Sequence, residues 1–542
     1  MKIHFLGASK VVTGSNILIT TDKYNVLLDC GLFQGSEELE SLNQLPFEFE
    51  PKDIDYLFLS HSHIDHSGRI PKLVKEGFNG KILCTKATKE LSEIMLVDSA
   101  HIQESDVNWE NRKRKRAGKP LISPLYSVEE AEASLRYFES ALYNQKISVN
   151  EDISVRFRDA GHILGSSIIE IWITENKSTT KIVFTGDLGM TDKPLIKNPE
   201  IIEDADYLIM ESTYGNRLHE NREKRTEKLM DIINETVLRG GSVIIPSFAV
   251  GRTQELIYEL NKYYEYKKDL EAHMKIPIYI DSPMATAATE VFKENAYCFN
   301  DETRQMILKG DNPFSFENLY FIKSHEESMR LNDTNYPKVV ISASGMCTAG
   351  RVRHHLKHNL WKANNSVVFV GYQANGTLGR LLQEGVKKVK LLGEEIVVLA
   401  NIHTIEGFSG HADQQELLSW VDKIKRKPKR IFLVHGEEAS TETLAKMLRE
   451  RFNIKTITPN IGYVYQISNG STEFSREILE PVQRKENIKE ELQKVYEQFE
   501  SLVLKTDRFW NPELLDKDYD KIKNKLLDLQ RELLDLSILL GD

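Results

Sequence analysis

The chain has 542 residues and a formal net charge of −10, from 71 Lys and Arg against 81 Asp and Glu. This length exceeds one ordinary hydrophobic core and predicts two or three domains. Hydrophobic residues make up 40 % and charged residues 28 %, which is typical of a soluble globular protein and excludes a disordered class. Because the whole chain is acidic, a nucleic-acid site would have to be a local basic patch.

The cysteines and the N-terminus indicate the compartment. The four cysteines lie far apart and form no C-x-x-C pair, which argues against a disulfide framework or a cysteine zinc site. The N-terminus runs into a predicted strand without an apolar signal core, and no stretch approaches the ~20 apolar residues of a membrane helix. We therefore expect a cytoplasmic protein with no membrane contact.

The N-terminal part alternates short predicted strands with turns. Residues 3–32 end in a buried strand that closes on Asp29-Cys30-Gly31, which by itself is ordinary turn chemistry. Another buried strand, 55–59, leads into Ser60-His61-Ser62-His63-Ile64-Asp65-His66, and a helix-compatible stretch covers 70–77. The histidines therefore lie on a strand-to-helix loop, where α/β folds usually place chemistry.

This histidine-rich loop predicts a metal site. Three histidines and one aspartate occur within six positions, and neutral imidazole and carboxylate are ligands that suit zinc and related ions. A tight loop can direct His61 and His63 at one ion and Asp65 and His66 at a second. A solvated polar loop is the alternative, but it would not concentrate so many imidazoles behind a strand.

Residues 69–150 carry predicted helices, one short strand at 81–85, and a run of five basic residues from Arg112 to Arg116. The run has two readings that the sequence leaves open. It is either a solvated helix face or flexible loop, or it is a contact for phosphate groups.

Two further candidate ligands follow predicted loops and strands. His162 is flanked by Gly161, which permits close backbone approach, although a lone histidine is more often a satisfied core or surface residue. Asp187 ends the buried strand 181–187, where its two oxygens can reach two cations. Alone, it would be read as an aspartate in a Gly-Asp turn.

After strand 207–210 and Glu211, apolar strands alternate with helical patterns. This alternation predicts a parallel α/β sheet in a second domain that is inserted into the first. The predicted elements are strands at 242–246, 276–281, 338–342 and 366–371 and a helix at 252–262. Beyond them lie His411 and, at the end of strand 430–435, His435.

Residues 476–542 predict a helical hairpin interrupted by Pro512. Apolar residues from Tyr519 to Leu540 repeat at alternating spacings of three and four, which is an a/d stripe. The stripe can dock on the chain's own body or form a homodimer contact, and the pattern leaves both open.

Taken in order, these motifs resemble those of the metallo-β-lactamase superfamily. Glu211, His411 and His435 resemble motifs A, B and C of its β-CASP branch, which includes the cleavage-and-polyadenylation endonuclease subunit and its bacterial and archaeal relatives. RNA-directed members have histidine at motif C, whereas DNA-repair members have valine. The resemblance implies an α/β fold: an αββα sandwich (1–205 and 406–475), an inserted α/β β-CASP domain (206–405) and a C-terminal helical extension (476–542).

The resemblance also implies a two-zinc site and its catalytic residues. Asp65, Glu211 and His411 would be catalytic, with His411 held by Glu211 as the general acid, and Asp29 would support the ligands by hydrogen bonding. Ser409, Arg252 and Arg380 are expected phosphate contacts. The first zinc would be held by His61, His63, His162 and Asp187, and the second by Asp65, His66, Asp187 and His435.

The implied activity is zinc-dependent hydrolysis of single-stranded RNA by hydroxide attack, leaving 5′-phosphate and 3′-hydroxyl ends. Endonucleolytic and 5′-exonucleolytic modes both remain open. One alternative is a hydrolase of thioesters, lactams or small phosphodiesters, but a small substrate needs no long inserted domain. The other is a non-catalytic RNA-binding scaffold, but such relatives have lost metal ligands, and here none is missing.

Overall fold

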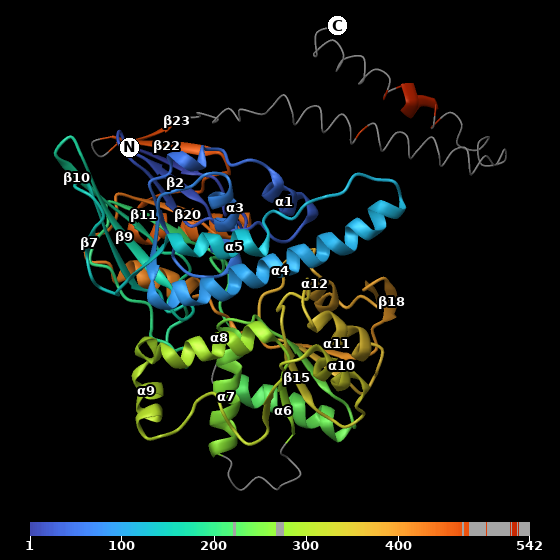
Figure 1. Ribbon diagram of the computed structural model, residues 1–542. Coiled ribbons are helices and arrows are strands. Elements are labelled where there is room, and N and C mark those ends of the chain that lie inside the picture. The colour runs from blue at the N-terminus through green and yellow to red at the C-terminus, as the bar shows by residue number, and fades with distance from the viewer. Residues whose placement is uncertain are drawn as a thin grey trace. The chain divides into compact units, whose positions relative to one another are not determined.

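The fold is described from a computed structural model of the chain (Figure 1). The chain divides into two compact units, Met1–Ile478 and Leu479–Asp542. Among the described residues, none of the helices is long and apolar enough to span a membrane. The structure describes residues 1–219, 224–266, 276–374, 376–468 and 471–475, together with positions 495, 521, 523–527 and 529.

The predicted C-terminal hairpin lies almost wholly outside the described residues. This applies to its interruption at Pro512, to most of its a/d stripe and to the homodimer contact that the stripe suggested. The fold below is therefore that of the first unit.

An eight-stranded sheet forms one layer of the first unit. It is antiparallel up to the third strand of the chain and parallel beyond it. Two of its strands come from the end of the unit and pair beside the first strand. The order is β23 (Ser471–Ser475), β22 (Tyr463–Ser468), β1 (Lys2–Phe5), β2 (Ile17–Thr20), β3 (Asn25–Leu28), β4 (Tyr56–Phe58), β5 (Lys81–Thr85) and β6 (Phe138–Ala141).

A seven-stranded sheet forms the facing layer. Its order is β21 (Lys455–Ile457), β20 (Arg430–Val434), β11 (Tyr207–Glu211), β10 (Ser178–Phe184), β9 (Ser167–Glu175), β8 (Ile153–Asp159) and β7 (Ile147–Ser148). Strand β11 pairs in parallel with β10 and β20. The predicted domain boundary at residue 206 is therefore wrong by one strand, because the backbone of β11 completes this sheet and the insertion starts after Glu211.

Apolar side chains from the two sheets meet in one core. Along β8 burial alternates, so that Ile153, Val155 and Phe157 point inward and pack with Phe5 and Phe432 of the other strands. Outer helices cover both sheets, which confirms the predicted αββα sandwich (Figure 1). They are α2 (Ile64–Ser67), α3 (Ile70–Lys75), α4 (Lys86–Arg116) and α5 (Val128–Ser134) on one side, and α13 (Gln414–Asp422) and α14 (Glu438–Phe452) on the other.

The insertion is built on a six-stranded parallel sheet, as the sequence predicts. Its order is β14 (Leu319–Phe321), β13 (Ile278–Ile280), β15 (Val339–Ser342), β12 (Val243–Pro246), β16 (Ser366–Phe369) and β19 (Asn401–Thr404). The described helices of the insertion are α6 (Arg225–Leu238), which precedes the sheet, and α7 (Arg252–Tyr266), α8 (Pro283–Glu294), α9 (Asp301–Leu308), α10 (His325–Asp333), α11 (Val352–Asn359) and α12 (Leu378–Gln383).

Short elements complete the first unit. A two-stranded sheet of β17 (Lys388–Leu391) and β18 (Glu394–Val397) follows α12. Near the N-terminus, α1 (Glu37–Ser41) precedes two 3₁₀ turns, and others occur along the chain. The 3₁₀ turns are η1 (Leu42–Gln44), η2 (Pro51–Asp53), η3 (Leu135–Tyr137), η6 (Ala296–Cys298) and η7 (Glu406–Phe408).

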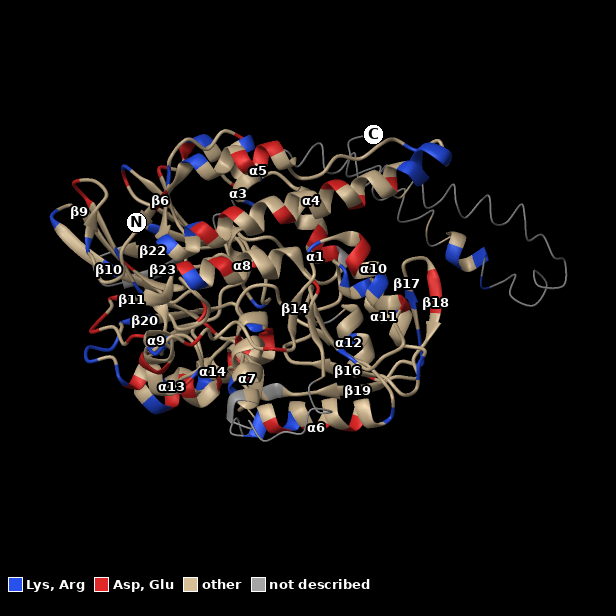
Figure 2. Ribbon diagram, turned by 60° about the horizontal axis from the view of Figure 1, so that its bottom comes forward, with Lys and Arg blue, Asp and Glu red and all other residues tan. Residues whose placement is uncertain are grey.

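The 31-residue helix α4 connects the sandwich to the insertion. Thr85 caps its start, and Ala87, Leu91 and Met95 are buried in one core cluster with Leu256 of the insertion. The rest of the helix runs on past this cluster, and basic residues gather at its far end (Figure 2). The sandwich and the insertion thus share packed side chains beside the loops that carry the predicted ligands.

Candidate metal centre

The loop after β4 carries His61 and His63, and α2 carries Asp65 and His66. A tight backbone turn brings these four side chains together. Gly31 makes the turn possible, because a Cβ at this position would fall 1.6 Å from the carbonyl oxygen of Asp65. The conformation of the loop is therefore set by the strand β3 that precedes Gly31 as well as by its own residues.

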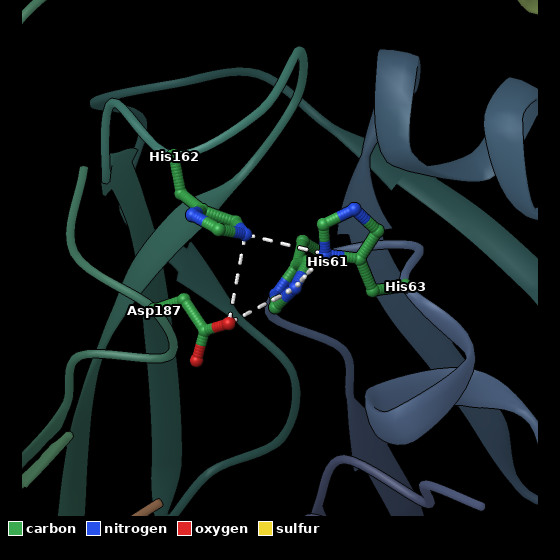
Figure 3. Close-up of side chains that lie close together, drawn as sticks. All are labelled: His61, His63, His162 and Asp187. Carbon is green, nitrogen blue, oxygen red and sulfur yellow. Dashed lines mark hydrogen bonds and ion pairs between the residues drawn. The ribbon is translucent and has the colours of Figure 1, made fainter. Parts of the chain in front are cut away.

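One cluster joins His61 and His63 to His162, in the loop after β8, and to Asp187, after β10 (Figure 3). Nδ1 of His63 lies 3.2 Å from Nε2 of His61 and 3.2 Å from Nε2 of His162. Oδ2 of Asp187 lies 3.5 Å and 3.6 Å from the same two Nε2 atoms. Four ligand atoms from three separate loops thus converge on one point.

A second cluster joins Asp65 and His66 to His435, which follows β20. Nε2 of His66 lies 3.1 Å from Nε2 of His435, and Oδ2 of Asp65 lies 3.5 Å from that atom. Asp187 reaches this cluster with its other oxygen, since Oδ1 lies 3.4 Å from Nε2 of His66. Asp187 therefore faces both clusters, one oxygen to each.

The spacing of these atoms fits two metal ions. A tetrahedral zinc with Zn–N distances of ~2.0–2.1 Å separates its ligand atoms by about 3.3 Å. The distances in both clusters lie within a few tenths of an ångström of that value. Oδ1 of Asp187 is buried without a hydrogen-bond partner among the described residues, which a cation would supply. The seven side chains could therefore hold two ions that share Asp187.

Hydrogen bonds behind three histidines set which ring nitrogen faces the clusters. Oδ2 of Asp29 accepts a bond from Nδ1 of His66 at 2.7 Å, and the carbonyl of Gly410 accepts one from Nδ1 of His162 at 3.2 Å. Nδ1 of His435 lies 3.1 Å from the hydroxyl of Thr213. Each Nδ1 proton is thereby committed, so each Nε2 presents its lone pair inward, as a metal ligand must.

Burial and neighbouring charges adjust the pKa values toward metal binding. Burial lowers the pKa of His61 and of His162 well below the usual value, and that of His63 to about 4. Burial would raise the pKa of Asp187, but the nearby imidazoles, first that of His435, hold it well below its usual value. Neutral imidazoles and an ionised carboxylate are the forms that bind metal.

His66 differs from the other ligands. Burial lowers its pKa, but Asp187, Asp65 and Asp29 together outweigh burial and raise the pKa well above the usual value. Three carboxylates around one imidazole attract positive charge to this point. A proton or a metal ion can provide that charge, and the second cluster is suited to the metal because His435 faces it as well.

His411 and Glu211 form a pair beside the clusters. Nδ1 of His411 lies 3.2 Å from Oε2 of Glu211, which is fully buried at the end of β11. Burial lowers the pKa of His411, but Glu211 and then Asp187 raise it above the usual value. Nδ1 also lies 3.8 Å from Oδ2 of Asp187. The raised pKa favours the protonated form of His411, whose ring lies within reach of the shared carboxylate.

The three expected phosphate contacts lie in different surroundings. The hydroxyl of Ser409 accepts the backbone N–H of His411 at 3.2 Å, which fixes that loop. Arg252 is buried, pairs with Glu255, and lies 3.7 Å from the position that a Cβ on Gly410 would occupy. Arg380 is more exposed and pairs with Glu384 at 2.7 Å. Their role in phosphate binding stays a prediction.

Several contributing groups were not found from the sequence, among them Thr213, the carbonyl of Gly410 and Lys193. Lys193 is buried and donates to the carbonyl of His162 at 2.7 Å, and burial lowers its pKa to about 8. Thr213 faces His435 because β11 pairs with β20 so that Glu211 lies opposite Val434. The role of the Thr213 hydroxyl could be recognised only from the register of these two strands, which are distant in the sequence.

Thr213→Val tests the contribution of that hydroxyl to metal binding. The change keeps the side-chain shape but removes the partner of Nδ1 of His435, so we expect metal affinity at the second cluster to fall about 10–100-fold. The first cluster should keep its affinity. Competition with a chelating dye measures both, with Thr443→Val, on a half-buried threonine of α14, as the control. Equal affinities in the variant and the unaltered protein would contradict a role for Thr213.

Comparisons with known proteins match most of the chain. Family models match the metallo-beta-lactamase superfamily at residues 10–146, the Beta-Casp domain at 253–382 and the Zn-dependent metallo-hydrolase RNA specificity domain at 395–459. The chain is 37 % identical over 451 residues to "Ribonuclease TTHA0252" of Thermus thermophilus, covering 83 % of this chain and 96 % of that protein. It is 31 % identical over 469 residues to "Transcription termination factor FttA" of Methanocaldococcus jannaschii, covering 85 % and 70 %.

Proposed function

This chain belongs to the β-CASP branch of the metallo-β-lactamase superfamily, a branch of metal-dependent RNA-processing hydrolases, and from that premise we propose that it is a zinc-dependent ribonuclease acting on single-stranded RNA. The observation that carries the proposal is the shared Asp187, which faces two clusters of ligand atoms beside the Glu211–His411 pair. Such an arrangement suits phosphodiester hydrolysis, in which one group must be attacked and another must leave with a proton.

The residues divide the chemistry among them. When bound, two zinc ions would supply positive charge for the scissile phosphate and would lower the pKa of a water molecule toward neutrality. His61, His63 and His162 would hold one ion, Asp65, His66 and His435 the other, and Asp187 would join them. His411 would give its proton to the departing 3′ oxygen, and Glu211 would keep that imidazole charged and oriented.

The inserted domain supports an extended substrate. Phe248, in the loop after β12, places its ring 6.3 Å from that of His63, and a Cβ on Gly345 would fall 2.9 Å from Phe248. Loops of the insertion therefore lie directly beside the ligands. A covered site of this kind admits a single strand more readily than a duplex, and unpaired RNA can be held by its backbone and stacked bases.

RNA should be cut faster than the same sequence as DNA or as a blunt duplex. We expect this preference because the relative with the highest identity reported above is a ribonuclease and because motif C carries His435. Added salt should weaken binding of the RNA, since phosphate contacts release counterions. Initial rates on end-labelled strands measure the preference, with nitrocefin and a thioester as small-substrate controls. Equal rates on RNA and DNA would show that His435 does not indicate a preference for RNA.

The same end-labelled strands decide the mode of cleavage. We propose internal cleavage, with removal of nucleotides from the 5′ end as a second mode of the same site. Mapping products from RNAs with 5′-hydroxyl or 5′-monophosphate ends separates the two, because only stepwise removal depends on the end group.

A further inference from the structure

The far end of α4 carries an unbroken run of five basic residues, from Arg112 to Arg116. Six basic residues occur between residues 112 and 119, and no acidic residue lies between Asn111 and Val128. Arg112 to Arg116 are helical, so the run is not a flexible loop, but the helix alone does not decide between a solvated face and a phosphate contact. We call Trp109, Arg112, Lys115, Arg116 and Lys119 the α4 tip, and Figure 2 shows its basic part at the end of the helix, away from the sandwich.

The basic side chains of the α4 tip are not used inside the fold. Arg112, Lys115, Arg116 and Lys119 are exposed and make no ion pair with any described residue. A helix C-terminus attracts cations, but it carries only about half an elementary charge and acts within the last turn. The four cations of the α4 tip exceed what that end needs, and Arg112 and Arg116 repel each other at a spacing of four residues.

Hydrogen bonds hold the chain around the α4 tip in one conformation. The segment after the helix folds back on it, because Asn111 and Ile122 exchange two hydrogen bonds of 2.8 and 2.9 Å and Arg114 donates to the carbonyl of Pro120 at 2.7 Å. The side chain of Trp109 is 57 % exposed, and Nζ of Lys113 lies 3.0 Å from its ring centroid. An exposed aromatic ring beside clustered cations is the combination that holds single-stranded nucleic acid.

The α4 tip is also linked to the metal centre. At the start of α4, Thr85 and Thr88 donate to the carbonyl of Gly165 at 2.7 and 2.8 Å, close to His162. The rise from Thr88 to Arg114 is about 39 Å, which is about a dozen stacked nucleotides at ~3.4 Å each. One rigid helix therefore fixes the distance between the catalytic loops and the α4 tip.

We propose that the α4 tip is a second RNA-binding surface that holds the strand outside the metal centre. The proposal rests on the proposed ribonuclease function and adds a length dependence to it. RNAs too short to span the distance should be cut through the metal centre alone, whereas longer RNAs should bind more tightly.

The test compares an 8-nucleotide RNA with a 40-nucleotide RNA of the same composition. The variant Arg112→Ala/Lys115→Ala/Arg116→Ala should cut the short RNA at the rate of the unaltered protein. Its kcat/KM for the long RNA should fall on the order of tenfold, and the slope of log affinity against log salt should decrease by about 2, since each single-strand phosphate contact contributes ~0.7. Lys177→Ala/Lys309→Ala/Lys390→Ala, which removes three exposed lysines elsewhere, is the matched control and should behave as the unaltered protein.

Trp109→Ala gives an independent readout. Loss of base stacking should weaken the long RNA about fivefold or more while leaving the salt slope unchanged, because stacking releases no counterion. Unchanged affinity of both variants for the long RNA would overturn the proposal, as would an equal loss on the short RNA. If a variant keeps full RNA affinity but its molecular mass in solution changes, the α4 tip is a contact between protein chains and the proposal is overturned.

The proposal and the proposed function can fail separately. If the unaltered protein cuts neither RNA, the ribonuclease function fails. Filter binding of the 40-nucleotide RNA to the unaltered protein and to the triple variant then decides the α4 tip by itself: tighter binding by the unaltered protein supports the surface, and equal binding refutes it.

Discussion

Asp187→Ala should empty both metal sites at once. The unaltered protein should carry close to two zinc equivalents, and the variant should hold less at each cluster, because Asp187 offers Oδ2 to the first and Oδ1 to the second. Loss of one ligand from a single cluster, as in His61→Ala, should empty mainly that cluster. RNA cleavage by Asp187→Ala should fall on the order of 10³-fold or more, since several kcal/mol of charge stabilisation leave with the metals.

Elemental analysis of protein purified without chelators measures this effect. Asp206→Ala, which removes an aspartate paired with Lys429 near the surface, is the control and should keep both metals. A preparation of unaltered protein with one metal or fewer would count against two sites. Full occupancy in Asp187→Ala would count against the shared carboxylate.

His411→Ala and His435→Ala should fail for different reasons. Nε2 of His435 lies among the ligand atoms of the second cluster, so its loss should reduce metal content together with activity. Nδ1 of His411 faces Glu211, so its loss should leave both metals bound. Cleavage by His411→Ala should slow by roughly 10²–10⁴-fold, the usual range for a positioned proton donor. The exposed His101→Ala is the control and should change neither quantity.

The leaving group gives a sharper distinction between the two histidines. An RNA with sulfur in place of the bridging 3′ oxygen departs as a thiolate, which needs little protonation. This substrate should restore much of the lost rate of His411→Ala, measured as single-turnover rates with zinc saturating. It should not restore His435→Ala, whose defect lies in metal binding. A defect of His411→Ala that is the same on both substrates would refute the proton-donor role and leave phosphate binding as the simpler one.

The sequence alone predicted the secondary elements that carry the site. Apolar runs such as 55–59 and 181–187 indicated strands, and polar residues directly after them indicated loops at strand ends. The parallel sheet of the insertion was predicted for the same reason, because buried strands alternated with helical patterns. These signals are local, so one chain without any structure is enough to read them. The boundary at residue 206 failed because the pairing of β11 with β10 and β20 is not a local property.

Tertiary structure alone decided how the site is held. His66 donates a hydrogen bond to Asp29 and His162 donates one to the carbonyl of Gly410, while Nδ1 of His435 faces the hydroxyl of Thr213; all three partners are distant in the sequence. Strand register and close backbone approach select these partners, and neither produces a recognisable pattern in the sequence. The basic run of α4 illustrates the same limit. Its composition did not decide between a solvated surface and a phosphate contact. Only the tertiary structure showed that α4 starts beside Gly165, near the metal centre, and ends at an exposed tip.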